Sequence, residues 1–371
     1  MTDISIFSES YPEAREKFLV AASKANAEIK SYKHPTHYGP NDEPLFMDVA
    51  RVGHADARNI LVIGSGTHGI EGYSGSAAQS YWLNRHTPND LDSDTAVLLF
   101  HAHNPWGFAH ALRYTEEHVD LNRNFIDFSK PLPDNPGYAD VHALIAYDEW
   151  NEDEVDRSFE RLSELREAIG EQAFSDAFNG GQYSHSDGIF YGGIRPQWSN
   201  IVFRQALQEH LSCARNAGVI DFHTGIGPPR GHVFLCFHQP GSAAYQRALD
   251  WWGERAVNRE GVTHKAVAKY QGLLVDAFVD SLPNTETTAV VVEFGTLPRT
   301  DMQRAAMAGR WLWSSSEPAS SPVRTQLMKL VREAFYPSAP DWRAGVLQQA
   351  TDIIDKAIAG LQRTPTTVIG E

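Results

Sequence analysis

The sequence has little cysteine, little positive charge and no long apolar run, and each shortage excludes a class of protein. Its 371 residues include only two cysteines, Cys213 and Cys236, so neither a disulfide framework nor a thiolate metal cluster is available. Both cysteines stand in hydrophobic surroundings and are predicted to be buried. Lys and Arg together number 32 against 47 Asp and Glu, which gives a formal net charge of −15. Because nucleic acids and anionic membranes attract clustered positive charge, neither is an expected partner.

Targeting signals and domain breaks are also missing. The first residues, MTDISIFSESYPEAREKFL, lack the basic region and apolar core of a secretory signal, so we expect a cytoplasmic protein. The longest apolar runs, 60–63 and 96–100, are too short to cross a bilayer. No repeat or linker divides the chain. The sequence therefore predicts a single catalytic domain over 1–371, with a helical insertion at about 126–200 and a helical C-terminal segment at about 301–371.

Predicted strands and helices alternate along the chain. Short apolar runs rich in β-branched residues predict strands, and apolar residues three and four apart predict helices. This alternation predicts an α/β fold, a three-layer α/β/α sandwich with a mostly parallel, mixed central sheet. The predicted strands are 59–64, 95–101, 219–222, 232–237 and 289–294. The predicted helices are 12–29, 72–83, 150–178, 203–213, 325–335 and 345–361.

The segment LVIGSGTHGIEG, at the end of the first predicted strand, has two interpretations. Gly64, Gly66 and Gly69 match G-x-G-x-x-G between a strand and a helix, which is typical of dinucleotide binding and would indicate a nucleotide-binding oxidoreductase. That motif also expects an acid at the end of the next strand to bind the ribose, and here the next strand leads into HAH. Thr67 and His68 are bulky where the backbone should approach a pyrophosphate. We therefore favour the second interpretation.

In the second interpretation, His68 and Glu71 form H-x-x-E and offer two metal ligands from a strand-end loop. A catalytic zinc ion takes three protein ligands and a water, so a third ligand is required. His223, in GVIDFHTGIG, also follows an apolar strand and precedes a glycine-rich turn. Because open parallel sheets bind ligands at the carboxyl ends of their strands, the three side chains are predicted to converge on zinc, with Asp221 as an acceptor for a ligand imidazole. The alternative is that His68 and Glu71 only satisfy each other at a turn.

A zinc hydrolase also needs a base and groups that bind anions. Glu293 ends the apolar run AVVVEFG, where a carboxylate is costly unless it faces a polar cleft or a cation, so it is the candidate general base. Arg123 beside Asn122 fits a clamp for a substrate carboxylate, and Arg113 fits a stabiliser of an oxyanion. The alternatives are that Glu293 pairs with a core arginine and that both arginines pair with acids on the surface.

Taken together, these residues resemble the zinc carboxypeptidases over 59–296. The order is that of the family: H-x-x-E, N-P-x-G with a downstream Arg, an Asn-Arg pair, a strand-end His and a strand-end Glu. The phrases SGTHGIEG, NPWGFA, VDLNRNF and DFHTGIG are similar to a bacterial branch near the succinylglutamate desuccinylase and aspartoacylase deacylases. The resemblance implies His68, Glu71 and His223 as zinc ligands, Arg113 as the group that polarises the scissile carbonyl, Asn122 and Arg123 as the carboxylate clamp, Glu293 as general base and acid, and Tyr270 as a substrate cap.

The expected function is therefore a zinc-dependent, carboxypeptidase-like hydrolase that cleaves an amide bond next to a free carboxylate in a small peptide or an N-acyl amino acid. An N-acyl amino acid deacylase of the same fold is the nearest alternative, and a zinc-binding module without catalysis is another. The separation of Glu71 from His223 exceeds the usual one in that family, which we attribute to the insertion at 126–200. Its HSDGIFYGG stretch is either a substrate-contacting turn or a surface loop. A homo-oligomer is left open.

Overall fold

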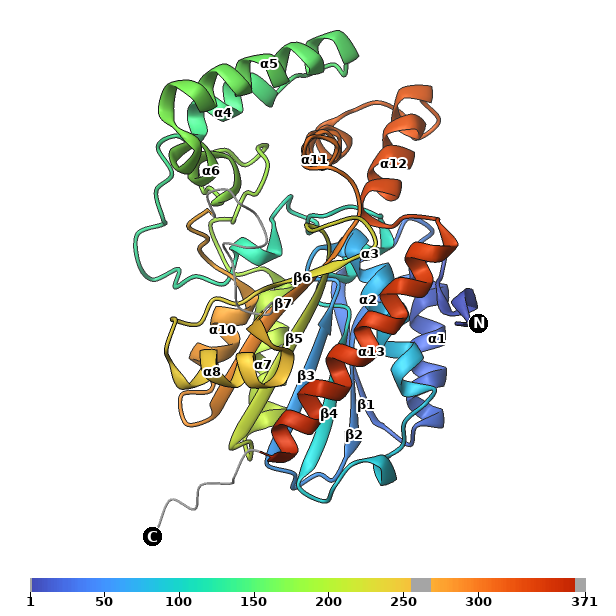
Figure 1. The fold of residues 1–371 in the computed structure, drawn as a ribbon. Helices are drawn as coiled ribbons and strands as arrows, with labels where there is room; N and C mark the ends of the chain where they lie inside the picture. The colour runs from blue at the N-terminus through green and yellow to red at the C-terminus, as the bar shows by residue number, and fades with distance from the viewer. Residues whose placement is uncertain (1, 255–267, 364–371) are drawn as a thin grey trace.

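A computed structural model describes residues 2–254 and 268–363, so the end of the predicted C-terminal segment, 364–371, lies outside the described residues. The core is a seven-stranded sheet in the order β1-β2-β4-β3-β5-β7-β6 (Figure 1). The strands are β1 Glu28–Tyr38, β2 Pro44–Gly53, β3 Asn59–Ser65, β4 Thr95–His101, β5 Asn216–Gly225, β6 His232–Leu235 and β7 Glu286–Gly295.

The centre of the sheet is parallel and its edges are antiparallel. Strands β4, β3, β5 and β7 run parallel, whereas β1, β2 and β6 are paired antiparallel to their neighbours. β3, β4 and β5 are buried along their whole length, as expected where helices cover both faces. From β3 the chain moves to β4 on one side, and from β5 it moves to β6 and then β7 on the other. The strand order therefore reverses between β3 and β5, the point at which open α/β sheets bind ligands.

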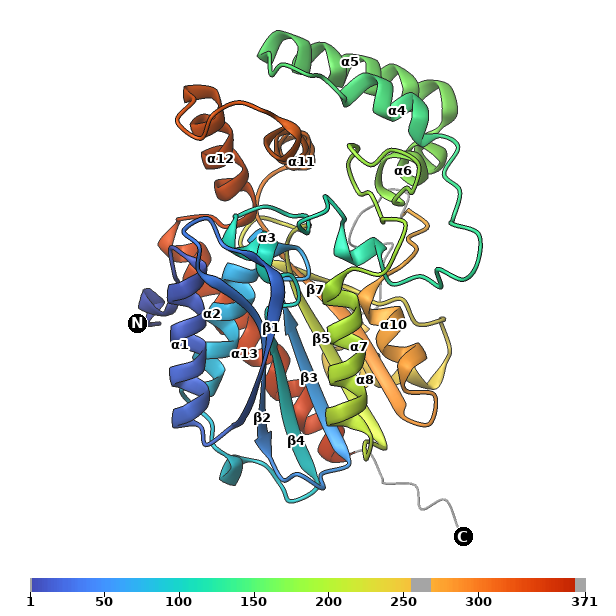
Figure 2. The same ribbon diagram turned by 180° about the vertical axis from the view of Figure 1, so that it is seen from behind.

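Helices cover both faces of the sheet, which confirms the predicted three-layer α/β/α sandwich (Figures 1 and 2). Leu61 and Ile63 of β3 pack in one core with α1, α2, α8 and α13, while Ile60 and Val62 pack in another with α7 and α10. The α-helices are α1 Tyr11–Lys24, α2 Gly72–Leu83, α3 Pro105–Ala109, α4 Tyr138–Ile145, α5 Glu152–Ile169, α6 Glu171–Asn179, α7 Trp198–Leu211, α8 Ala243–Trp252, α10 Leu274–Ser281, α11 Arg299–Ser314, α12 Pro322–Phe335 and α13 Pro340–Arg363. Four short 3₁₀ helices are η1 Ile4–Ile6, η2 Gly69–Glu71, η3 Pro88–Asp90 and η4 Leu121–Arg123.

A group of helices stands beyond the carboxyl ends of the parallel strands. Figures 1 and 2 show α4, α5 and α6 on one side of this end and α11 and α12 on the other. The first three helices share a small core, which includes Tyr138, Phe174 and Phe178, and Met307 of α11 packs into it. Arg304 of α11 is ion-paired with Glu152 and Asp156 of α5. The strand ends therefore lie beneath a helical roof that the predicted insertion and α11 build together.

The structure corrects several expectations from the sequence. The helix predicted over 12–29 ends at Lys24, because Asn26 takes a left-handed conformation (φ 52°) and β1 follows. Gly170 (φ 86°) divides the segment predicted as one helix over 150–178 into α5 and α6. Strands β1 and β2 were not predicted, since β1 is an edge strand with an exposed, polar sequence. The prediction that both cysteines are buried is wrong for Cys213, which follows the end of α7 and is exposed.

Membrane insertion finds no support in the helices. Within 2–254 and 268–363, no helix combines the length and the apolarity that a crossing of the bilayer requires.

Leu61 offers a test of the central strand. Its side chain is fully buried in β3, so Leu61→Ala removes apolar contacts and leaves a cavity, and we expect the free energy of unfolding in urea to fall by about 2–5 kcal/mol. Val20→Ala on the outer face of α1, where the side chain is 46% exposed, is the matched control and should stay within about 0.5 kcal/mol of the unmodified protein. Equal effects of the two changes would contradict the assigned core.

Candidate metal centre

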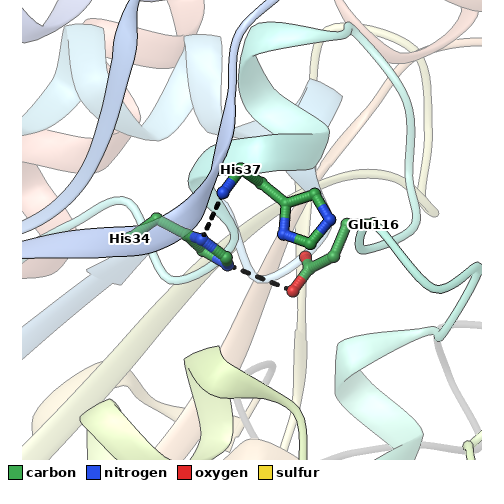
Figure 3. A group of neighbouring side chains, drawn as sticks. All are labelled: His34, His37 and Glu116. Atoms are coloured by element: carbon green, nitrogen blue, oxygen red, sulfur yellow. Dashed lines mark hydrogen bonds and ion pairs between the residues drawn. The ribbon is translucent and has the colours of Figure 1, made fainter.

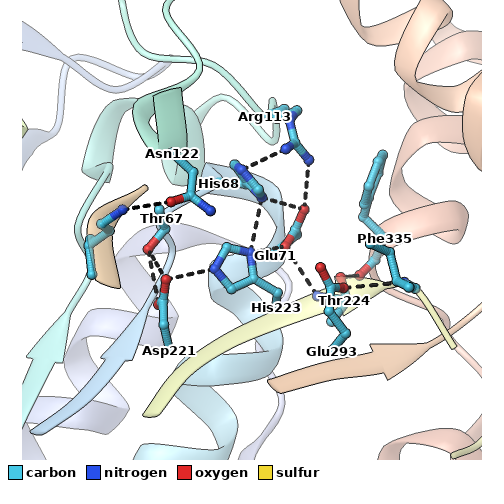
Figure 4. Close-up of polar contacts among 12 residues, drawn as sticks. Thr67, His68, Glu71, Arg113, Asn122, Asp221, His223, Thr224, Glu293 and Phe335 are labelled. Atoms are coloured by element: carbon cyan, nitrogen blue, oxygen red, sulfur yellow. Dashed lines mark hydrogen bonds and ion pairs between the residues drawn. The ribbon is translucent and has the colours of Figure 1, made fainter. Parts of the chain in front are cut away.

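The three predicted ligands converge at the reversal point of the sheet (Figure 4). His68 follows β3, Glu71 ends η2, and His223 lies near the end of β5. The Nδ1 atoms of the two histidines are 3.1 Å apart. The Glu71 carboxylate lies 2.9 Å from His68 Nδ1 through Oε1 and 3.0 Å from His223 Nδ1 through Oε2. All three residues are at most 4% exposed.

This spacing fits a metal ion. Tetrahedral zinc with bonds of about 2.0–2.1 Å places neighbouring ligand atoms roughly 3.3 Å apart. The distances among His68 Nδ1, His223 Nδ1 and the Glu71 carboxylate, 2.9–3.1 Å, are close to that value. Two imidazole nitrogens and a carboxylate oxygen are also a donor set that zinc accepts in catalytic sites, with a fourth position left for water. The residues present therefore fit a catalytic divalent cation.

A second layer of carboxylates orients both imidazoles. His223 Nε2 donates to Asp221 at 2.7 Å, and the hydroxyl of Thr67 donates to the same carboxylate at 2.9 Å. His68 Nε2 lies 3.3 Å from an oxygen of Asp120. Arg113 Nη2 lies nearer to the same His68 nitrogen, at 2.6 Å. Because each Nε2 faces these outer side chains, each Nδ1 is directed at the shared space in the middle. Carboxylates in this position fix the tautomer of a metal-binding histidine and raise its basicity.

The buried charges around the site are unbalanced. Four carboxylates, those of Glu71, Asp120, Asp221 and Glu293, are each at most 6% exposed. Of the three arginines among the described residues that line the cleft, Arg299 is exposed, so Arg113 and Arg123 are the two that accompany these carboxylates. Burial of unpaired negative charge is costly, so a divalent cation would neutralise the excess.

Charged neighbours oppose the effect of burial on the pKa values of His223 and Glu71. Although burial alone would lower it, Asp221 and Glu71 hold the pKa of His223 well above its usual value. Although burial alone would raise it, the neighbouring His68 and His223 lower the pKa of Glu71. A metal ion at this position would supply the positive charge that a proton on His223 supplies.

Arg113 reaches the centre from the loop between α3 and η4. Its Nε donates to Asp120 at 2.9 Å, its Nη1 donates to Glu71 at 3.2 Å, and its Nη2 lies 2.6 Å from His68 Nε2. Arg113 thus pairs with an acid, Asp120, as the alternative interpretation expected. The pair lies at the metal centre, however, and not on the surface. The backbone carbonyl of Arg113 also accepts from the Gly69 amide at 3.2 Å, which ties its loop to the turn that carries the ligands.

Glu293 stands beside the ligands without joining them. In the register of β5 and β7 it is the direct partner of His223, and paired residues of parallel strands point to the same side of the sheet. Its Oε2 accepts from the Ile226 amide at 3.2 Å. Burial, with the charge of Glu71 adding to it, raises the pKa of Glu293 to about 7. Such a carboxyl group can both accept and return a proton near neutral pH.

The predicted carboxylate clamp lies on η4. Asn122 Oδ1 accepts from the Leu274 amide at 2.9 Å, so its amide nitrogen faces the centre (Figure 4). Two nitrogens of Arg123 donate to the backbone carbonyls of Asn122 and Asn179, at 2.7 and 3.0 Å, and its buried Nε makes no hydrogen bond within the described residues. The guanidinium stacks on Tyr270, 4.8 Å from the ring centre. All three residues are thereby brought to one wall of the cleft.

A single cleft of about 610 Å³ joins these groups. Its lining includes every predicted site residue except His223, which contacts Glu71; the lining residues are His68, Glu71, Arg113, Asn122, Arg123, Tyr270 and Glu293. Sequence reasoning missed Thr67, which holds Asp221, and placed Asp120 only as a surface partner. It also missed Phe178 and Phe190, which the insertion contributes to the cleft. Asp120 could have been found from its position in VDLNRNF, whereas the two aromatic residues carry no local signal.

The glycines of the dinucleotide interpretation have another role. A side chain at Gly69 would lie 2.0 Å from the backbone of Gly107, and one at Gly64 would lie 2.5 Å from His103 Nε2. Gly66 has a φ of 69° and faces Ala102. These residues are small because other parts of the chain pack against them, so they do not form an open phosphate-binding loop.

A second group of possible ligands, His34, His37 and Glu116, lies outside the cleft lining; Figure 3 shows its side chains. His34 Nδ1 accepts from the His37 backbone amide at 3.1 Å, so its proton is on Nε2, which donates to Glu116 at 3.1 Å. A protonated Nε2 has no lone pair for a metal. We therefore interpret the group as a hydrogen-bonded clamp that fastens β1 to the loop between Arg113 and Asp120.

A family model matches residues 7–349, described as "Protein of unknown function (DUF2817)". The chain belongs to the DUF2817 family. No curated protein matches the chain at a significant level.

Solved structures similar to this DUF2817 chain include carboxypeptidase A from Helicoverpa armigera, with 12% identity, coverage of 88% of this chain and 74% of the other, and a TM-score of 0.45. A candidate metallopeptidase from Shewanella baltica has 12% identity, coverage of 86% and 92%, and a TM-score of 0.44. A candidate succinylglutamate desuccinylase/aspartoacylase from Shewanella frigidimarina has 14% identity, coverage of 80% and 75%, and a TM-score of 0.36. The families named from the sequence thus recur among the structural neighbours.

The stoichiometry of metal binding tests the site. We expect about one equivalent of zinc or a similar divalent metal in the purified DUF2817 protein, because one centre has the fitting donors. His223→Ala should remove it, whereas His37→Ala in the second group should leave it unchanged. Elemental analysis after desalting measures both, and loss of the metal with His37→Ala alone would show that the wrong group was chosen.

Asp221 provides a graded test of the same centre. Asp221→Asn keeps the shape but loses the charge that orients His223, so we expect zinc affinity to fall by about 10–100-fold. Competition with a chromophoric chelator measures the change. Asp94→Asn, on a surface acid that pairs with Arg58, is the control and should leave the affinity unaltered. An unaltered affinity in Asp221→Asn would contradict the orienting role.

Proposed function

We propose that this DUF2817 protein is a zinc-dependent hydrolase that cleaves an amide bond next to a free carboxylate. The observation that carries the proposal is the meeting of two Nδ1 atoms and a carboxylate, beside the buried Glu293, in a cleft that also holds Arg123. His68, Glu71 and His223 would hold the ion. When bound, zinc supplies a Lewis acid that polarises a carbonyl group and makes a water molecule more acidic.

Glu293 would transfer the proton. It accepts a proton from the attacking water, whose oxygen forms a bond to the carbonyl carbon. As the carbon–nitrogen bond breaks, Glu293 returns that proton to the leaving amine, so the products are an acid and an amine. Its position is supported by the bond to the Ile226 amide, which holds one carboxylate oxygen and leaves the other directed to the cleft.

Arg113 would stabilise the oxyanion that forms on the carbonyl group. Asp120 holds its Nε, and the present contact of its Nη1 with Glu71 is an attraction to negative charge. If Glu71 held a cation, this attraction would be weaker, and Nη1 would be able to donate to substrate. A fixed donor aimed at developing negative charge contributes to catalysis because it needs no reorganisation during the reaction.

Arg123 would bind the substrate carboxylate, with Asn122 and Tyr270 at its sides. Its Nε is buried without a partner among the described residues, an arrangement that is costly unless a ligand completes it. Carboxylates are the anions that a guanidinium binds in a two-pronged manner. The same site would accept a small peptide or an N-acyl amino acid, since both present an amide next to a carboxylate.

Replacement of Glu293 tests the proposed reaction. Glu293→Gln should lower kcat on dipeptides and N-acyl amino acids by at least about 10²-fold and leave zinc bound, because the amide cannot accept the proton and Glu293 is not a ligand. Glu286→Gln, at the opposite end of β7 and exposed, is the matched control and should keep full activity. Undiminished turnover in Glu293→Gln would refute the assigned base.

Replacement of Arg123 should distinguish an effect on substrate binding from an effect on the chemical step. Arg123→Ala is expected to raise KM for carboxylate-bearing substrates by about 10-fold or more, with a smaller effect on the corresponding amides, which lack the charge. Steady-state kinetics on each acid and its amide make the comparison. If both substrates lose the same factor, Arg123 does not bind the carboxylate.

A further inference from the structure

Two groups of apolar side chains line the cleft. One, the carboxylate wall, adjoins the Arg123 side that Tyr270 covers; the other, the acyl wall, is built by the insertion, α11 and α12. The carboxylate wall consists of Leu235, Phe237, Tyr270, Leu273 and Val291, and the acyl wall of Phe178, Phe190, Met302, Ala306 and Phe335.

The carboxylate wall continues from the clamp. Tyr270 stacks on the Arg123 guanidinium, and the Phe237 ring meets the Tyr270 ring edge-on at 6.0 Å. Leu235 and Val291 are register partners on β6 and β7. The carboxylate wall would therefore surround the substrate residue whose carboxylate Arg123 binds.

The acyl wall packs against the end of β5 that carries His223. A side chain at Gly225, two residues after His223, would lie 2.9 Å from Met302 Cε and 3.7 Å from Phe335 Cε1. The Phe335 carbonyl accepts from the Thr224 hydroxyl at 2.6 Å, and Figure 4 shows Phe335 next to Thr224. Because Gly225 has no side chain, Met302 and Phe335 lie close to the backbone at the end of β5.

Phe190 is a member of the acyl wall that lies next to the two buried arginines. Its ring centre lies 5.1 Å from the guanidinium carbon of Arg113 and 5.7 Å from that of Arg123. It also contacts Phe178 of α6, with ring centres 6.3 Å apart. Its φ of 54° is unfavourable for a non-glycine residue, and the side chain is nevertheless held over both arginines. A substrate carbonyl group bound at Arg113 would thus lie next to the Phe190 ring.

The charge of the lining limits what the acyl wall can bind. Among the described residues that line the cleft, the only carboxylates are Glu71 and Glu293, which the proposed reaction already uses. The free ammonium group of an unblocked dipeptide would therefore lie near apolar side chains and the cationic Arg299, with no acid to pair with it. Loss of hydration without a partner is costly for an ammonium group, whereas an uncharged apolar acyl group gains from the same surroundings.

We propose that the acyl wall is the binding site for the acyl half of the substrate and that it selects amino acids blocked by an uncharged, apolar acyl group over free dipeptides. This inference takes the orientation of the substrate from the proposed function and rests on it. Phe178 and Phe190 come from the insertion and Met302 from α11, so the selectivity arises from the helical roof.

Kinetics on a substrate series test the selection. The substrates are the N-acetyl, N-butanoyl and N-hexanoyl forms of one amino acid and a free dipeptide that ends in the same amino acid. With the zinc-loaded protein, kcat/KM should rise by roughly fourfold for each added methylene, and the free dipeptide should be the poorest substrate. Equal kcat/KM values across the series would overturn the proposal.

Variants of Met302 test the location. Met302→Gln, which keeps the length of the side chain but makes it polar, should flatten the dependence on acyl length, and Met302→Glu should raise kcat/KM for the free dipeptide relative to the N-hexanoyl substrate. Ile194→Ala, in the same roof but 66% exposed and outside the cleft lining, is the control and should keep the dependence. A dependence on acyl length that survives in Met302→Gln would place the acyl group elsewhere.

A binding measurement separates this inference from the proposed reaction. Titration calorimetry on Glu293→Gln with the same N-acyl amino acids should show Kd falling with acyl length, whether or not any bond is cut. If the unmodified protein hydrolyses none of the compounds but the Kd values follow this order, the proposed function fails and the acyl-binding site stands. If hydrolysis occurs and neither Kd nor kcat/KM follows acyl length, the acyl-binding site is refuted and the hydrolase stands.

Discussion

Two histidines and a glutamate lie within 2.9–3.1 Å of one another inside the core of this protein, and the surrounding structure is arranged to hold that contact. Asp221 and Asp120 turn the far nitrogen of each imidazole away from the shared space. Such a concentration of buried polar and charged groups is costly without a cation among them. It is sustained by the rigid ends of β3 and β5, whose register leaves little freedom at the reversal point of the sheet.

The local part of this arrangement could be predicted from the sequence. The candidate ligands and the candidate base all follow apolar runs: His68 and Glu71 come after one, and His223 and Glu293 lie near the ends of two others. Strand ends of a parallel sheet meet at one edge, so the convergence of these side chains follows from the fold class. The predicted strands 59–64 and 95–101 match β3 and β4 closely for the same reason, since fully buried strands have unbroken apolar sequences.

What could not be predicted depends on contacts between distant segments. Edge strand β1 is too polar and exposed to have a periodic pattern, and Asn26 ends α1 through a backbone conformation that no apolar spacing records. Phe190 reaches the cleft only because the insertion folds back over η4, and neither its neighbours in HSDGIFYGG nor its own identity marks it as a lining residue. The metal centre could thus be predicted from the sequence, whereas the part of the cleft that the helical roof forms depends on contacts between distant segments.

The most direct test of the account is the anomalous scattering of zinc in crystals of the metal-loaded protein. The account predicts one peak at about 2.0–2.2 Å from the Nδ1 atoms of His68 and His223 and from a carboxylate oxygen of Glu71, with their Nε2 atoms still facing Asp120 and Asp221. A zinc ion bound at His34, His37 and Glu116 instead, or no ordered zinc at the end of β5, would contradict it.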